Sequence, residues 1–259
     1  MRPWLTRFFE GTKRMTCRIG ILGFGRFGRL MARNLAVDFD VRVCDPAVVD
    51  TDVLSTGARP ADLAAVGNCG VVALAVPISR MQDALTQIRP HLTAGSLVVD
   101  VCSVKERPVR WMQELLPEDV GILGTHPMFG PDSAADSLQG RKIVLCRVRL
   151  EAERYEKIRR YLGSKGLAAI ETSPAEHDRQ IAVSLALTHF IGRALAGMGA
   201  MPQAIDTEGY RRLLRILEVV ENDTWQLFED MNRFNSHAGK ARQAFLDALE
   251  AIERKLGVP

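Results

Sequence analysis

The stretch CRIGILGFGRFG at residues 17–28 decides the fold class. Its first half is an apolar run that predicts a β-strand, and its second half holds the pattern G-x-G-x-x-G at residues 23–28. A helical pattern follows from about Arg26 to Ala36. Strand, glycine turn and helix in this order predict a dinucleotide-binding unit, because the N–H groups at the helix N-terminus can hold a pyrophosphate.

Each glycine of the pattern has its own expected role. Gly23 permits the tight turn, Gly25 lets the backbone approach the pyrophosphate, and Gly28 lets the helix pack closely on the strand. The predicted cofactor site combines this turn with an aspartate at the end of the second predicted strand and two residues at the end of the third predicted strand. Its residues are Gly23, Phe24, Gly25, Arg26, Phe27, Gly28, Asp45, Val76 and Pro77. The alternative is an ordinary glycine turn with no ligand.

Asp45 lies 22 residues after Gly23, at the end of the second predicted strand. A carboxylate at this place meets the ribose hydroxyls and repels a 2′-phosphate, which favours NAD over NADP. Arg42 and Arg59 leave NADP as the open alternative, since either can pair with a 2′-phosphate.

Strand runs alternate with helical patterns up to the run GLAAIETS at 166–173, and the rest of the chain is helical. Pro202 and the stretch NSHAG at 235–239 predict the breaks between the later helices. We therefore expect an N-terminal extension at 1–16, an α/β Rossmann-type dinucleotide-binding domain at 17–172 and an all-α substrate and dimerisation domain at 173–259.

The composition of the 259 residues is that of a globular protein, with 47% hydrophobic and 25% charged residues. A net charge of +3 gives no reason to expect nucleic acid or an anionic membrane as partner. The five cysteines are odd in number and contain no C-x-x-C pair, so we expect no disulfide framework, no metal site and a cytoplasmic location.

Two further segments concern the cellular location of the protein and its first residue. The N-terminal 15 residues lack the apolar core of a signal peptide, and Met15 is a possible true start. The apolar window at 181–201 contains Ser184, His189 and Arg193, so it predicts a buried helix and not a membrane span.

Four motifs resemble the prephenate and arogenate dehydrogenases of tyrosine biosynthesis. They are DVCSVK at 100–105, GTHPMFGPDS at 124–133, HDRQIAVSLALTHFIGRAL at 177–195 and LLRILEVVENDTWQLF at 213–228. The resemblance extends from about Arg18 to Asn235 and is nearest to the arogenate branch known from plants. Enzymes of that branch use NADP, and the acid at Asp45 departs from this preference. It implies NAD-dependent oxidative decarboxylation of prephenate to 4-hydroxyphenylpyruvate, of arogenate to tyrosine, or of both.

The resemblance also implies catalytic roles for two residues that end predicted strands. His126 matches the catalytic histidine of the family, and a neutral imidazole suits the task of accepting the proton of the ring hydroxyl. Ser103 matches a serine that hydrogen-bonds near that hydroxyl and the nicotinamide. The alternatives are a histidine satisfied by backbone groups and a turn serine.

Three residues of the helical half are candidates for the substrate. Arg215 matches the family arginine that binds the ring carboxylate, and it is favoured over Arg211 and Arg212. His189 is either a core histidine or part of the substrate pocket. Asp223, eight residues after Arg215, attracts the ammonium of arogenate if the helix is unbroken; otherwise it interrupts or caps that helix.

A dinucleotide-binding domain followed by helices is also compatible with two other functions, and its helices predict an oligomeric state. A β-hydroxyacid or imine-type reductase also joins a Rossmann domain to helices, but we find no helical N-x-x-x-K pair, and Lys105 follows a strand instead. A non-catalytic dinucleotide-binding protein has no need of Ser103, His126 and Arg215 together. The apolar C-terminal helices predict a homodimer, while the sequence leaves feedback inhibition and the role of residues 1–15 open.

Overall fold

The computed structural model describes residues 17–220 and 222–257. The chain divides at Pro174 and Ala175 into two compact units. The N-terminal extension expected at residues 1–16 lies outside the described residues.

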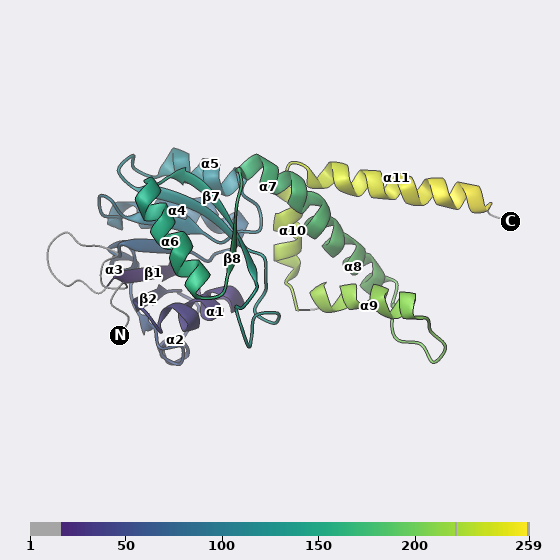
Figure 1. Cartoon of the computed structure of the whole chain (residues 1–259), viewed down its shortest axis with the longest axis horizontal. Coiled ribbons are helices and arrows are strands. Elements are labelled where there is room, and N and C mark those ends of the chain that lie inside the picture. The colour runs from purple at the N-terminus through teal and green to yellow at the C-terminus, as the bar shows by residue number, and fades with distance from the viewer. Residues whose placement is uncertain (1–16, 221, 258–259) are drawn as a thin grey trace. The chain divides into compact units, whose positions relative to one another are not determined.

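Unit 1 is built on a sheet of eight strands in the order β3-β2-β1-β4-β5-β6-β7-β8 (Figure 1). The strands are β1 Arg18–Leu22, β2 Asp40–Cys44, β3 Arg59–Pro60, β4 Val71–Leu74, β5 Leu97–Asp100, β6 Gly121–Pro127, β7 Lys142–Arg149 and β8 Ala168–Glu171. Every neighbouring pair is parallel except β6 and β7. The Rossmann-type fold expected from the glycine turn is therefore confirmed.

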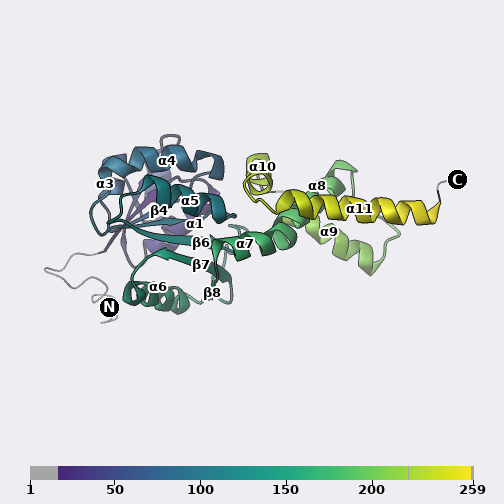
Figure 2. The ribbon, with the colours of Figure 1, turned by 90° about the horizontal axis from the view of Figure 1, so that it is seen from above.

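Helices cover both faces of this sheet. They are α1 Arg26–Leu35, α2 Asp50–Leu54, α3 Leu63–Gly67, α4 Met81–Ile88, α5 Glu106–Leu115 and α6 Ala152–Ser164, with short 3-10 turns η2 Ile78–Arg80 and η3 Arg89–His91. Figure 2 shows α4 and α5 on one side of the sheet and α6 on the other. Residues of α1 and α6 line one common pocket, which places these two helices on the same face.

The central strands are apolar because helices bury both of their faces. Ile21 and Val43 belong to one core cluster under α1, and Leu97 and Leu145 belong to a second cluster under α6. Helix α5 begins at Glu106, two residues before Pro108. Proline is tolerated there because the first turn has no intrahelical use for its missing N–H.

Unit 2 is helical, as expected. Its helices are α7 Pro174–Ile181, the π-helical segment η4 Ala182–Leu187, α8 Thr188–Gly197, α9 Glu208–Val220, α10 Trp225–Arg233 and α11 Ala238–Leu256. The predicted breaks near Pro202 and at residues 235–239 are present.

Of the two alternatives for Asp223, the structure has the interrupted helix, so Asp223 does not lie on one continuous helix with Arg215. Helix α9 ends at Val220, and α10 starts at Trp225 with Thr224 as its N-cap, whose hydroxyl accepts from the Leu227 N–H at 3.1 Å. The run Asn-Asp-Thr explains the break, because such side chains compete for backbone hydrogen bonds and favour helix starts.

Two further properties concern the described residues as a whole. None of their helices combines the length and the apolar character needed to cross a membrane. All five cysteines carry free thiols. Burial raises the pKa of Cys17 to about 11, so this thiol stays protonated at neutral pH.

Candidate active site

The glycine turn follows β1 and opens α1, and its geometry explains glycine at each position. Gly23 has a φ of +98°, and a Cβ there would lie 2.5 Å from the Ala75 carbonyl oxygen. A Cβ on Gly28 would lie 2.3 Å from the Gly23 carbonyl oxygen. A Cβ on Gly25 would meet no atom within 4 Å, which leaves open space above the turn.

The N-terminus of α1 is suited to an anion. Gly25 is its N-cap and supplies no side-chain cap, and no acidic residue lies in the first turn. The first N–H groups of a helix have no intrahelical partner and carry the positive end of the helix dipole. The open turn and these N–H groups fit a pyrophosphate.

Asp45 lies directly beside this turn. Its Oδ2 accepts from the Phe24 N–H at 2.6 Å, and its Oδ1 accepts from the Ala47 N–H at 2.9 Å. The Phe24 side chain is buried in the core, so Phe24 reaches a cofactor only through its backbone. The acid therefore stands where the end of β2 meets the glycine turn, as the spacing predicted.

Val76 and Pro77 follow β4, the other neighbour of β1. A Cβ on Gly23 would lie 3.0 Å from Cγ1 of Val76, so this segment contacts the glycine turn. The chain runs outward from β1 to β2 and β3 and then crosses back to β4 on the other side of β1, and open α/β sheets bind their ligands where the strand order reverses in this way.

Ser103 and His126 lie at the carboxyl ends of the neighbouring strands β5 and β6. Ser103 comes three residues after β5, and His126 is the penultimate residue of β6. Both are buried, and the Ser103 hydroxyl has no hydrogen-bond partner among the described residues. A buried hydroxyl without a partner is costly in a folded protein, which points to a ligand that would satisfy it.

The loop after His126 reaches the start of α1. The rings of Phe27 and Phe129 have centroids 6.2 Å apart, and Arg26 forms an ion pair with Asp132 at 2.5 Å. These contacts bring the two motifs GFGRFG and GTHPMFGPDS side by side, although about 100 residues separate them in the chain. No pattern in the sequence predicted the ion pair between Arg26 and Asp132.

Unit 2 brings together two of its three predicted substrate residues. His189 is buried, and its Nε2 lies 3.7 Å from Oδ2 of Asp223. Its Nδ1 has no hydrogen-bond partner among the described residues. Burial lowers the pKa of His189, while Asp223 raises it and Arg193 lowers it, so the ring is neutral at cellular pH. The π-helical segment η4 ends just before His189, and such segments often mark functional sites.

Arg215 lies on α9 and is exposed. Its two rivals are engaged, since Arg211 pairs with Asp206 and Glu208, and Arg212 pairs with Glu208. Within the part of the chain that the structure describes, no acidic side chain forms an ion pair with Arg215. Its charge is therefore available to an anion.

Arg193 is a residue of unit 2 that sequence reasoning passed over. Its guanidinium donates to the backbone carbonyl of Asp223 and lies over the rings of Trp225 and Phe228. Arg193 follows His189 by four residues, so helical spacing already places both on one face. An arginine one helical turn after a candidate histidine was a sufficient reason to count Arg193 among the candidate substrate residues.

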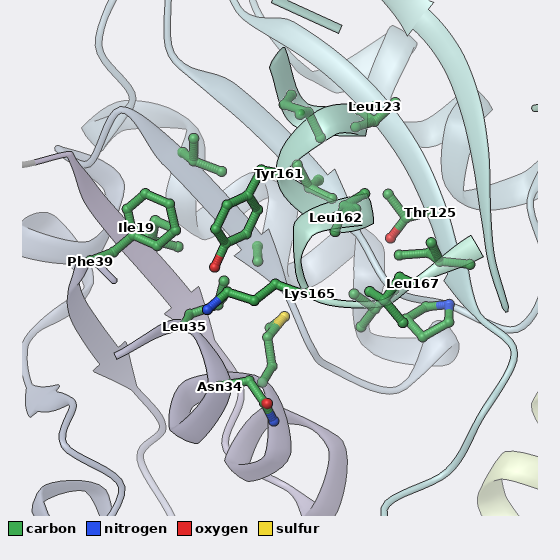
Figure 3. A pocket seen from close by; sticks show the side chains of 18 of the residues that line it. Ile19, Asn34, Leu35, Phe39, Leu123, Thr125, Tyr161, Leu162, Lys165 and Leu167 are labelled. Atoms are coloured by element: carbon green, nitrogen blue, oxygen red, sulfur yellow. The ribbon is translucent and has the colours of Figure 1, made fainter. Parts of the chain in front are cut away.

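A pocket of unit 1 with a volume of about 210 Å³ lies elsewhere, between the sheet and the helices α1 and α6. Its floor is apolar and includes Ile19 and Leu123 (Figure 3). The polar groups at its edge are engaged, because Lys165 pairs with Asp38 and the Tyr161 hydroxyl donates to Asp38 at 3.0 Å. The nitrogen donors that line it, Asn34, Arg154 and Lys165, each bond to a group of the protein, so they do not form the donor set that a pyrophosphate requires.

Two family models match the chain. One describes the nucleotide-binding domain of prephenate dehydrogenase and matches residues 46–170. The other describes a TYRAAT1-like C-terminal domain and matches residues 194–258.

Named relatives agree with these models. Arogenate dehydrogenase 2, chloroplastic, from Arabidopsis thaliana is 32% identical over 258 residues, covering 95% of this chain and 72% of the relative. Arogenate dehydrogenase 1, chloroplastic, from the same plant is 29% identical over 252 residues, covering 92% of this chain but only 39% of that relative.

A solved structure shares the fold. Prephenate dehydrogenase from A. aeolicus, in complex with hydroxyphenyl propionate and NAD⁺, has a TM-score of 0.74 and 21% identity over 93% of this chain and 90% of that chain. The resemblance expected from the four motifs is confirmed, and so is the expectation of an oxidoreductase. The chain belongs to the family of prephenate and arogenate dehydrogenases.

Proposed function

We propose that the protein oxidatively decarboxylates prephenate, arogenate or both, with NAD as hydride acceptor. Family membership supports this reaction type. The observation that carries the proposal is that unit 1 places the glycine turn, Ser103 and His126 at the carboxyl ends of β1, β5 and β6. Ligands of open α/β sheets bind at that edge.

The choice of NAD rests on Asp45. Its carboxylate contacts the Phe24 N–H and stands at the end of β2, where the ribose of a dinucleotide is expected. A fixed negative charge there repels a 2′-phosphate. The bound nicotinamide would accept the hydride from C4 of the substrate ring, and the helix α1 would hold the pyrophosphate through backbone N–H groups.

His126 handles the proton of the C4 hydroxyl. Hydride loss from C4 makes that hydroxyl acidic, and a neutral imidazole accepts its proton. Loss of CO₂ from C1 then returns the electron pair of the C–C bond to the ring and restores aromaticity. The histidine gives the proton back to the phenolate oxygen, so the protons balance. Ser103 donates a hydrogen bond near the same oxygen.

The ring carboxylate needs a fixed cation, which we assign to Arg215. A guanidinium binds a carboxylate through two parallel hydrogen bonds. The pairing of Arg211 and Arg212 with acidic neighbours supports Arg215 for this role.

Substrate preference depends on His189 and Asp223. Prephenate carries a ketone on its side chain, and arogenate carries an ammonium at the same place. The carboxylate of Asp223, 3.7 Å from the neutral His189 ring, would attract that ammonium. We therefore expect Asp223→Asn to lower the ratio of kcat/KM for arogenate to kcat/KM for prephenate. An unchanged ratio means that Asp223 does not select the substrate.

The function is tested by NADH formation in the purified protein with each compound. We expect turnover with at least one of them, and His126→Asn should lower kcat by about 10²-fold or more while NAD binding persists. No NADH with either compound, in a protein that binds NAD, would reject the proposed reaction. Full turnover by His126→Asn would reject the role of the histidine.

We also propose a homodimer formed through unit 2 and a cytoplasmic location. Helix α11 exposes Leu246, Leu249, Ile252 and Leu256, which follow one another every three or four residues and so form one apolar stripe. A second copy that covers this stripe removes it from water, which supports the dimer. Five free thiols support a reducing compartment.

A further inference from the structure

Lys105, two residues after Ser103, has a side chain that is wholly buried. It pairs with Asp100, whose side chain is also 0% exposed. Lysine is almost never fully buried unless it is paired, because removing its charge from water is costly. The site needs no ammonium for proton transfer when His126 does that work, so the pair calls for another explanation.

The pair joins three segments of the chain. Lys105 donates to the Asp100 carboxylate and, at 2.5 Å, to the backbone carbonyl of Thr125. Asp100 Oδ2 also accepts from the Cys102 N–H at 3.0 Å, and its backbone carbonyl accepts from the Thr125 hydroxyl at 2.6 Å. The end of β5, the following loop and the end of β6 are thus tied at one buried point.

This point lies where regular strand pairing stops. The parallel ladder of β5 and β6 ends with the pair of Asp100 and Gly124. Beyond it, Thr125 bonds to the Asp100 side chain and carbonyl at the end of β5 and to Lys105, the N-cap residue of α5. A Cβ on Gly124 would make an ordinary contact with the Lys105 Cδ at 3.5 Å, whereas it would crowd Val109 at 3.0 Å and Cys146 at 3.2 Å.

The two candidate catalytic residues depend on this arrangement. Ser103 lies in the loop that Asp100 and Lys105 close, and His126 directly follows Thr125. We propose that Asp100 and Lys105 are positioning residues whose buried ion pair fixes Ser103 and His126 relative to each other without contacting the substrate. The catalytic part of this inference rests on the proposed function.

The test separates positioning from stability with two variants. Lys105→Met leaves a buried carboxylate without its partner, so we expect Tm to fall by about 6–12 °C and kcat to fall as well. Asp100→Asn/Lys105→Met has no buried charge, so most of the Tm returns. Its kcat should remain about 10- to 100-fold low, with KM for NAD unchanged, because the donor to the Thr125 carbonyl is still missing.

The matched control is Lys157→Met, which removes a surface pair with Glu153 and should change neither Tm nor kcat. A double variant that regains both Tm and kcat overturns the proposal, as does a Lys105→Met protein with normal kcat. If these variants do not fold, Thr125→Val replaces them, because it keeps the shape and removes only the hydroxyl bond to Asp100. We expect its kcat to fall severalfold, and an unchanged kcat again overturns the proposal.

A second readout does not need turnover. The ring resonances of His126, assigned by comparison with His126→Asn, should shift or broaden in the double variant and remain unchanged in Lys157→Met. Unchanged resonances in the double variant overturn the positioning role even if the wild type oxidises neither compound. Failure of the proposed function and failure of this inference are therefore distinguishable.

Discussion

Replacement of Gly28 by alanine tests whether the glycine turn holds the cofactor through α1. The added Cβ would lie 2.3 Å from the Gly23 carbonyl oxygen, and real contacts of this kind stay beyond 3.0 Å. The helix and the turn must therefore separate by about 0.7 Å, because the atom that blocks the methyl group is backbone and cannot rotate away.

The expected cost follows from that displacement. Overpacking of this size destabilises a protein by about 1–3 kcal/mol. A hydrogen bond from a backbone N–H group to the charged pyrophosphate contributes about 1.5–3 kcal/mol. If the displacement breaks one such bond, NAD binding weakens about 10- to 100-fold. Calorimetric titration with NAD and thermal unfolding measure the two effects on the same sample.

One further test variant and one control variant sharpen the result. A Cβ on Gly25 meets no atom of the protein within 4 Å but faces the expected pyrophosphate, so Gly25→Ala should weaken NAD binding without lowering Tm. Gly70→Ala, also free of contacts within 4 Å and outside the turn, should change neither. Normal NAD affinity in both Gly28→Ala and Gly25→Ala would refute the assignment of the cofactor to this turn.

Three further predictions concern unit 2. Arg215→Met should raise KM for the substrate at least about tenfold, whereas Arg211→Met, which removes an arginine already paired with acidic neighbours, should not; steady-state kinetics with equal effects would contradict this. Burial lowers the pKa of His189 in the folded protein below the value of 6.5 that it has in the unfolded chain. As the pH drops below 6.5, the unfolded chain therefore binds a proton at His189 before the folded protein does, and the free energy of unfolding falls. Denaturant unfolding from pH 7.5 to 5 should show a smaller loss for His189→Gln, and identical slopes would exclude the effect. Leu249→Glu/Ile252→Glu should turn the dimer into a monomer in equilibrium sedimentation, and a monomeric wild type would remove the basis of the dimer.

The local sequence was sufficient for the main elements of the fold. The turn at residues 23–28 requires glycine for reasons that act within a few residues, namely a positive φ at Gly23 and a close approach at Gly28. The alternation of apolar strands and amphipathic helices is likewise a local property, and it predicted the sheet and the helical C-terminal half. At Asp223 the sequence left a continuous and an interrupted helix open, and the structure has the interruption, with Thr224 as the N-cap of α10.

The candidate site, too, has features that the local sequence predicts and features that only the tertiary structure shows. The sequence by itself placed the candidate residues Asp45, Ser103 and His126 at or just after strand ends of unit 1, and the resemblance to the dehydrogenase family suggested the roles proposed for Ser103 and His126. Only the tertiary structure decided what surrounds them: Arg26 pairs with Asp132, and Lys105 is buried against Asp100 and Thr125. The physical reason is that such contacts form between strand ends and loops far apart in the chain, and no periodicity within one segment encodes which charge will meet which partner.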